Sequence, residues 1–159
     1  MFVSKKCYRF YFLCLKYLND LYDGVGPPVC VPKYTYLSVP QAVIHAGYDV
    51  QFTDNEWKGN YSLTPYPVID SATRFEKDMY KHPPKDFVHT VYPMMCISFH
   101  IKKQIPIGRG GMILTDNKEA AIELKKMSYD GRLPDVPWRE QDIKTIGYHY
   151  YMTPEIAQL

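Results

Sequence analysis

At 159 residues, the chain has about the length of one domain. Its composition is 46% hydrophobic and 15% aromatic, which suffices for a packed core, and its formal net charge of +2 indicates neither a nucleic-acid nor a membrane partner. No apolar run approaches the length of a membrane span, and the first residues lack the long uncharged core of a signal peptide. Four cysteines without a Cys-x-x-Cys pair are typical of buried, reduced thiols in a cytoplasmic protein.

The first half of the chain predicts helices that alternate with short strands. Residues 7–22 carry apolar side chains three and four positions apart, which predicts an amphipathic helix. The Gly24–Pro28 segment should end this helix. The further elements expected here are a strand at residues 29–31, a helix at 39–46 with Ser38 as its N-cap, a strand at 49–53 and a turn-rich loop at 55–67.

The second half continues the alternation. The elements expected here are a very short strand at Val68-Ile69 that ends in Asp70, a loop at 73–89 with a helical turn, strands at 94–99 and 111–114, a helix that Asp116 caps with Glu119 as its capping-box partner and that Gly131 ends, and a polar loop at 133–144. Short apolar strands between helices predict an α/β protein with a mainly parallel sheet. We expect one domain over residues 1–159.

Three chemically distinct features are expected at the carboxyl ends of strands, where such sheets bind their ligands. Tyr36 follows the first strand, Asp70 the third, and the Lys102–Lys103 pair the fourth. Each has an ordinary explanation by itself, because an aspartate after a strand often caps a helix, a lysine near a turn is usually solvated, and an aromatic side chain usually packs. Their common position at one sheet edge favours a binding site instead.

Several segments carry a resemblance to a known family. In chain order they are GVGPPVCVP at 24–32, PKYTY at 32–36, AGYDVQFTD at 46–54, VIDSAT at 68–73, SFHIKKQIPIGRGG at 98–111 and GYHYYM at 147–152. From about Ser4 to Leu159 the chain resembles the DegT/DnrJ/EryC1/StrS family of pyridoxal-phosphate-dependent sugar aminotransferases. The segment that leads from a serine through a lysine to a double glycine is the most specific of them.

The resemblance implies a pyridoxal 5'-phosphate cofactor and a role for each matching residue. Lys103, five residues after Ser98, stands at the position of the family's Schiff-base lysine, so Lys103 rather than Lys102 should carry the cofactor. Asp70 should pair with the pyridine nitrogen, Tyr36 should stack on the ring, and Ser98 should bind the phosphate. Further cofactor contacts are implied for Ser4, Thr73 and His149, the last from the neighbouring subunit of a homodimer.

The chemistry of such a cofactor requires these residue types. A lysine amine must lose its proton to attack an aldehyde, and the released amine can then shuttle a proton. A carboxylate beside the ring nitrogen keeps that nitrogen protonated and makes the ring an electron sink. Hydroxyls and backbone N–H groups near a helix start suit a phosphate. The resemblance implies a three-layer fold like the large domain of this enzyme class, in reduced form.

The chain also departs from the family pattern. Ser4-Lys5-Lys6 lacks the glycine of the family's phosphate loop, Arg109 replaces an acid, Tyr151 replaces an arginine, and Thr73 is shorter than the family's Gln or His. The segment between Asp54 and Pro67 is short, and no second, smaller domain follows. We therefore expect either a fragment of a longer protein or a reduced homologue.

Two functions remain open from the sequence. One is an aminotransferase that moves an amino group, with glutamate as the expected donor, to a nucleotide-linked keto-sugar. The other is a non-catalytic relic that binds cofactor or dimerises. A sugar dehydratase that uses the same cofactor has histidine in place of the lysine, and Lys103 argues against it. We expect no metal site.

Overall fold

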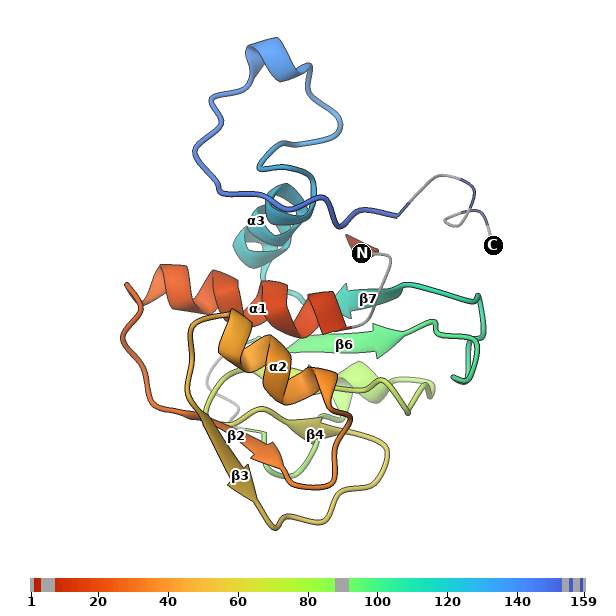
Figure 1. The fold of residues 1–159 in the computed structure, drawn as a ribbon. Coiled ribbons are helices and arrows are strands. Elements are labelled where there is room, and N and C mark those ends of the chain that lie inside the picture. The colour runs from red at the N-terminus through yellow and green to blue at the C-terminus, as the bar shows by residue number, and fades with distance from the viewer. Residues whose placement is uncertain (1, 4–7, 88–91, 153–154, 156–157, 159) are drawn as a thin grey trace.

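The computed structural model describes residues 2–3, 8–87, 92–152, 155 and 158. These residues form both helices and strands (Figure 1), and the predicted α/β class is confirmed. The elements are β1 (Phe2–Val3), α1 (Tyr8–Leu21), β2 (Val29–Pro32), α2 (Ser38–His45), β3 (Val50–Thr53), β4 (Tyr61–Ser62), β5 (Val68–Asp70), the 3-10 turn η1 (Met79–Lys81), β6 (Met94–Ser98), β7 (Gly111–Leu114), α3 (Lys118–Ser128) and the 3-10 turn η2 (Trp138–Glu140).

The strands form two sheets. The central sheet has the order β1-β7-β6-β5-β4, in which β5 and β6 are parallel and the other three pairs are antiparallel. Strands β2 and β3 form a separate parallel pair. Among the described strands, parallel pairing is confined to β2–β3 and β5–β6, and β7 returns from β6 through the 99–110 loop to pair antiparallel with it.

Both faces of the central sheet are covered. Met94 and Cys96 of β6 belong to a large core with α1, α2 and the β2–β3 pair, whereas the alternate residues Met95 and Ile97 belong to a second core with η1. Helix α1 lies between α2 and α3 on the first face (Figure 1). The second face is covered by η1 and irregular segments, so the third layer of the predicted three-layer fold contains no α-helix among the described residues.

Helix α1 supplies much of the large core. It spans almost the whole predicted segment, and Phe10, Leu13 and Leu15 are completely buried. Each such side chain stabilises the fold by about 1.5–3 kcal/mol relative to an exposed position. The helix ends before Gly24, which has a φ of +74° and thus a left-handed backbone conformation that suits glycine.

Two predicted helix starts are wrong by one residue. Helix α2 begins at Ser38 itself, and Leu37 before it already has a helical backbone and makes no side-chain cap bond, so Ser38 does not act as the N-cap. Asn117, not Asp116, caps α3 and accepts a hydrogen bond from Ala120 N at 3.0 Å. The N–H of Asp116 donates to the Tyr80 hydroxyl at 2.8 Å, and α3 begins two residues later at Lys118.

The predicted loop at residues 55–67 contains a strand. Tyr61 and Ser62 of β4 pair with Asp70 and Ile69 of β5, although their surroundings are polar and rich in turns. Two residues give no readable alternation, so only the pairing with β5 reveals this strand.

Three of the four cysteines lie within the described residues, and Cys7 lies outside them. Cys14 and Cys96 are buried with their Sγ atoms 3.9 Å apart, and Cys30 is only partly buried. Within the part of the chain that the structure describes, no helix is both long and apolar enough to cross a membrane.

Candidate functional site

A cleft of about 1060 Å³ opens at the carboxyl ends of β5 and β6. Its lining includes Tyr36, Asp70, Thr73, Ser98 and the Lys102–Lys103 pair, which come from segments far apart in the sequence. The sequence predicts Tyr36, Asp70 and the lysine pair at one sheet edge. In the structure all of them line this cleft, but Tyr36 follows β2 of the separate β2–β3 pair and not a strand of the central sheet. The cleft therefore forms where an α/β sheet is expected to bind a ligand.

Asp70 is the buried acid of the cleft. The residue is only 7% exposed, and three donors reach its carboxylate: Tyr11 OH to Oδ1 at 2.7 Å, Ala72 N to Oδ1 at 2.8 Å and Tyr61 OH to Oδ2 at 2.6 Å. Burial raises the pKa of Asp70 above its ordinary value, while these three hydrogen bonds and the charge of Lys103 act to lower it. Asp70 thus combines a desolvated position with donors that favour its charged form.

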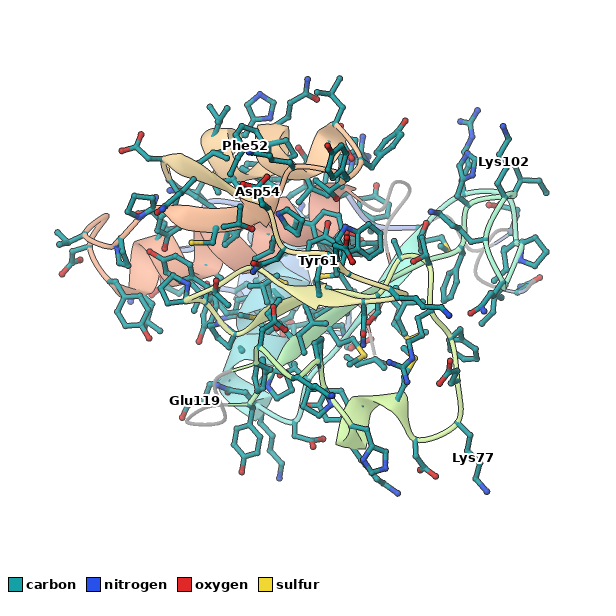
Figure 2. All side chains as sticks on the ribbon, turned by 90° about the horizontal axis from the view of Figure 1, so that it is seen from below. Phe52, Asp54, Tyr61, Lys77, Lys102 and Glu119 are labelled. Atoms are coloured by element: carbon teal, nitrogen blue, oxygen red, sulfur yellow. The ribbon has the colours of Figure 1, made fainter. Side chains whose placement is uncertain are left out.

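The two lysines differ in their surroundings. Lys103 is half-buried, and its charge acts on Asp70, whereas Lys102 is exposed. Figure 2 shows Lys102 projecting outward from the loop that follows β6. The backbone N–H of Lys102 donates to His100 Nδ1 at 3.2 Å, and the backbone N–H of Lys103 donates to His100 O at 2.8 Å, so both lysines belong to one tight turn. Of the two lysines, Lys103 is the one whose positive charge acts to lower the pKa of Asp70.

Ser98 ends β6 next to the glycine turn. Its hydroxyl oxygen accepts a hydrogen bond from His100 N at 3.3 Å, which leaves the hydroxyl hydrogen available to a ligand. Gly111, the partner of Ser98 in β7, has no room for a side chain: a Cβ there would lie 2.1 Å from Ile97 O. This glycine lets β7 pair closely enough to hold the end of β6 in place.

The rim of the cleft contains Tyr36 and Thr73. Tyr36 is 79% exposed, so its ring face is open to a ligand. Thr73 is also exposed, but its hydroxyl donates to Gly59 O at 2.8 Å. That bond occupies the donor that a ligand would otherwise use, and Thr73 here anchors the turn before β4.

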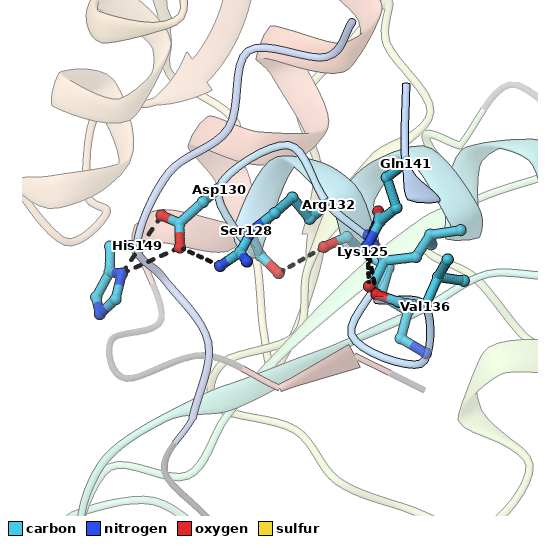
Figure 3. A network of polar contacts seen from close by, with 8 residues as sticks. Lys125, Ser128, Asp130, Arg132, Val136, Gln141 and His149 are labelled. Carbon is cyan, nitrogen blue, oxygen red and sulfur yellow. Dashed lines mark hydrogen bonds and ion pairs between the residues drawn. The ribbon is translucent and has the colours of Figure 1, made fainter. Parts of the chain in front are cut away.

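One predicted site residue, His149, is not among the residues that line this cleft. His149 lies on the C-terminal segment beside Asp130, with Nδ1 at 3.3 Å from both carboxylate oxygens, and its side chain is 67% exposed (Figure 3). Arg132 also contacts Asp130, at 3.5 Å. Ser4 lies outside the described residues.

The segment around His149 is nevertheless well held. Gly147 packs against the backbone of Asp130 and Gly131, and Tyr148 and Tyr150 pack on the Phe12 ring of α1. The preceding loop is closed by Gln141, whose amide bonds both the N–H and the carbonyl of Leu133 and the carbonyl of Val136 (Figure 3). His149 is thus presented outward from a packed segment.

Sequence reasoning missed four residues of the site. Tyr11, Trp57 and Arg109 line the cleft, and Arg109 belongs to the glycine turn. The Tyr61 hydroxyl donates to Asp70. Trp57 packs on Tyr61 with ring centroids 4.7 Å apart. The sequence pattern indicates for Tyr11 only a place on the apolar helix face, for Tyr61 only a loop, and for Arg109 only a departure from a family pattern.

The arrangement suits a ligand with a cationic ring atom and an anionic group. The buried Asp70 carboxylate can accept a hydrogen bond from the cationic ring atom, and the Ser98 hydroxyl can donate one to the anionic group. Half-buried Lys103 can act as a nucleophile or as a proton carrier between them. Among the described residues, no group of three or more His, Cys, Asp or Glu side chains is placed to hold a metal ion.

Comparison with known proteins supports the resemblance seen in the sequence. Residues 88–158 match the model of the DegT/DnrJ/EryC1/StrS aminotransferase family. No curated protein sequence matches the chain. The resemblance to this family is therefore confirmed for the C-terminal part of the chain, which includes the lysine pair and the glycine turn.

Solved structures establish the fold over nearly the whole chain. The sugar aminotransferase CalS13 from Micromonospora echinospora has a TM-score of 0.68 at 11% identity, over 95% of this chain and 52% of that one. Helicobacter pylori PseC, an aminotransferase involved in the biosynthesis of pseudoaminic acid, has a TM-score of 0.65 at 14% identity, over 94% and 48%. NtdA from Bacillus subtilis, solved with bound PMP, has a TM-score of 0.63 at 18% identity, over 95% and 40%. The chain thus spans about half the length of the structures it matches.

Proposed function

We propose that this chain is a pyridoxal-phosphate-dependent aminotransferase of the DegT/DnrJ/EryC1/StrS type. The observation that carries the proposal is the cleft at one sheet edge, where half-buried Lys103, buried Asp70, Ser98 and open Tyr36 meet. The family match over residues 88–158 and the aminotransferase fold support it independently.

The residues of the cleft fit pyridoxal 5'-phosphate. Lys103 Nζ would hold the cofactor covalently, Asp70 would face the ring nitrogen, and Tyr36 would stack on the ring. Ser98 would donate its hydroxyl hydrogen to the phosphate. The environment of Asp70 shows whether the cleft fits this cofactor. Its carboxylate is buried and already accepts hydrogen bonds from two tyrosine hydroxyls, and it is suited to accept one more from a ring N–H.

When bound, the cofactor supplies an electron sink that stabilises negative charge on a substrate carbon. Asp70 keeps the ring nitrogen protonated, which that sink requires. Lys103 Nζ would serve as the base that takes the proton from the substrate carbon and as the acid that gives a proton back. The half-buried position of Lys103 limits water around that amine, and the glycine turn fixes the strand end from which the lysine loop begins.

The proposal also includes the substrates and the assembly. We assign glutamate as amino donor and a nucleotide-linked keto-sugar as acceptor, in the synthesis of amino sugars for polysaccharides. The assembly is a homodimer in the cytoplasm, in which outward-facing His149 reaches the partner's phosphate site. Within the monomer, His149 contacts Asp130 instead of the cleft, so its proposed role requires a second copy.

A single experiment tests the central assignment. Purified protein is incubated with pyridoxal phosphate and reduced with borohydride, and the labelled peptide is mapped by mass spectrometry. We expect label on Lys103 in the wild-type chain and in Lys102→Ala, and no label in Lys103→Ala. Label on Lys102, or unchanged labelling of Lys103→Ala, would contradict the assignment.

A second function, a non-catalytic relic, is favoured by one specific observation. The Thr73 hydroxyl donates to Gly59 O instead of facing the cleft. The relic predicts cofactor labelling without amino transfer, or no labelling at all. The same preparation assayed with glutamate and a keto-sugar nucleotide separates the two functions.

A further inference from the structure

The strongest feature that the proposed function leaves unused is the pair of tyrosines around Asp70. Tyr11 and Tyr61 are 2% and 3% exposed, yet each directs its hydroxyl to a different oxygen of the same carboxylate. Tyr11 comes from α1, whereas Tyr61 comes from β4, the strand that pairs with β5 at the edge of the central sheet. In the view of Figure 2, Tyr61 lies near the centre and Lys102 near the edge of the molecule.

Resting on the proposed function, we infer that Tyr11 and Tyr61 are positioning residues that fix Asp70 with one acceptor site directed at the ring nitrogen of the cofactor. A carboxylate offers about four acceptor sites. Tyr11 and Ala72 N occupy two on Oδ1, and Tyr61 occupies one on Oδ2. The remaining site lies on Oδ2 of a side chain that lines the cleft.

The three donors also limit rotation of the carboxylate. They come from α1, from β4 and from the backbone just after β5, so any turn about the last side-chain bond of Asp70 breaks at least one hydrogen bond. The Tyr61 oxygen in turn lies within hydrogen-bond reach of Thr35 Oγ1. With Tyr61 donating to Asp70, the Thr35 hydroxyl donates to Tyr61, and such a chain polarises each bond in the direction that favours the carboxylate.

The charged form of Asp70 is the form that a ring N–H requires. Burial raises the pKa of Asp70, and the groups that oppose this are the two hydroxyls, Ala72 N–H and the charge of Lys103. When Lys103 binds the cofactor covalently, that lysine charge changes, but the hydroxyls remain. The two hydroxyls and Ala72 N–H are therefore the part of this environment that does not depend on the lysine charge.

Simple packing is the alternative for both rings. Tyr11 lies on the buried face of α1, and Tyr61 packs against Trp57. A phenylalanine at either position would preserve that packing and remove only the hydroxyl. Tyr66 offers a matched control, because it is buried to a similar extent (7% exposed) and donates to Pro27 O at 2.8 Å, away from Asp70.

The test compares Tyr11→Phe, Tyr61→Phe and Tyr66→Phe with the wild-type chain. Aspartate carboxyl carbons are labelled with ¹³C, and the apo protein is titrated by NMR, with Asp70→Asn used to assign the Asp70 signal. We expect the Asp70 titration to move upward in Tyr11→Phe and in Tyr61→Phe and to stay unchanged in Tyr66→Phe. If one variant fails to fold by circular dichroism, the other gives the answer.

Cofactor binding supplies the second readout. We expect affinity for pyridoxal phosphate to fall about tenfold in Tyr61→Phe, by the loss of one hydrogen bond to a charged acceptor. The ¹⁵N shift of the bound ring nitrogen should move toward the unprotonated form in that variant but not in Tyr66→Phe. An unchanged Asp70 titration in both cleft variants would overturn the inference. Failure of the wild-type chain to bind cofactor would instead overturn the proposed function, and the titration of the apo protein distinguishes the two.

Discussion

Substitution of Gly111 by alanine should disturb the strand that carries the site. A Cβ at this position would lie 2.1 Å from Ile97 O and 2.6 Å from Phe10 Cε2. To reach a normal contact of about 3.5 Å, the new carbon and the Ile97 carbonyl must separate by roughly 1.4 Å. The oxygen belongs to the backbone of β6 and cannot rotate away, so the β6–β7 pair itself must open.

The expected cost follows from that movement. Overpacking in a dense core costs about 1–3 kcal/mol. Weakening the Ser98–Gly111 end of the ladder and the neighbouring bond from Phe99 N to Gly110 O adds about 1 kcal/mol. We expect Gly111→Ala to lower the free energy of unfolding by about 3 kcal/mol, a large fraction of the roughly 5–15 kcal/mol of a natural domain.

Urea unfolding followed by circular dichroism measures this loss, with Gly108→Ala as the control. Gly108 lies in the same turn, and no atom stands within 4 Å of the place that its Cβ would take, but its φ of +115° disfavours other residues. We expect Gly108→Ala to cost only about 1 kcal/mol, through backbone strain alone. A free energy of unfolding for Gly111→Ala within about 0.5 kcal/mol of wild type would refute the close approach of β6 and β7.

Two further predictions concern Asp70 and the assembly. Because the folded pKa of Asp70 is raised, the folded chain holds this proton where the unfolded chain has lost it, so the free energy of unfolding should fall as pH rises from about 4 through the folded pKa. Urea unfolding from pH 4 to 8 should show a smaller fall in the free energy of unfolding for Asp70→Asn than for the wild-type chain. An equal dependence of this free energy on pH in both proteins would contradict the prediction. The Asp70→Asn variant should also lose more of its amino-transfer rate than of its affinity for the cofactor. Light scattering should give a dimer, and a monomer that transfers amino groups would remove the proposed role of His149.

The sheet edge was the most predictable part of the site. Buried strands leave long apolar runs, and all five residues of β6 are buried, so the run at 94–99 predicts a strand with nearly correct ends. Residues just after such strands must lie near one another when the strands are parallel neighbours, as β5 and β6 are. Asp70 and Lys103 could therefore be placed together from the sequence alone.

The environment of Asp70 was not predictable in the same way. Tyr11 is separated from Asp70 by 59 residues, and its spacing on α1 is that of any packed aromatic. Tyr61 belongs to a two-residue strand that exists only because β5 pairs with it. A hydroxyl at the end of a buried ring leaves no periodic signal, so its partner is found only in three dimensions.

The predicted start of α3 is wrong for a local reason. Asp116 and Asn117 are adjacent, and both residue types are good N-caps. The cap is the last residue before the helix that has a non-helical backbone, and that residue is Asn117. In the structure the Asn117 side chain accepts from Ala120 N, while Asp116 N donates to the hydroxyl of Tyr80, 36 residues away in sequence. A capping preference alone does not distinguish two adjacent residues that are both good caps.

The separation of β2–β3 from the central sheet has a consequence for hydrogen exchange. The pair is connected to the rest by the hydrophobic core, by the bond from Cys30 N to Thr64 O and by the Thr35–Tyr61 contact, and among the described strands no ladder continues between the sheets. Segments with few such connections open locally at a lower free energy than the whole fold. A ligand bound between Tyr36 and Asp70 would contact both the β2–β3 unit and the central sheet. Its binding should therefore slow the hydrogen exchange of the β3 amides, although no residue of β3 lines the cleft.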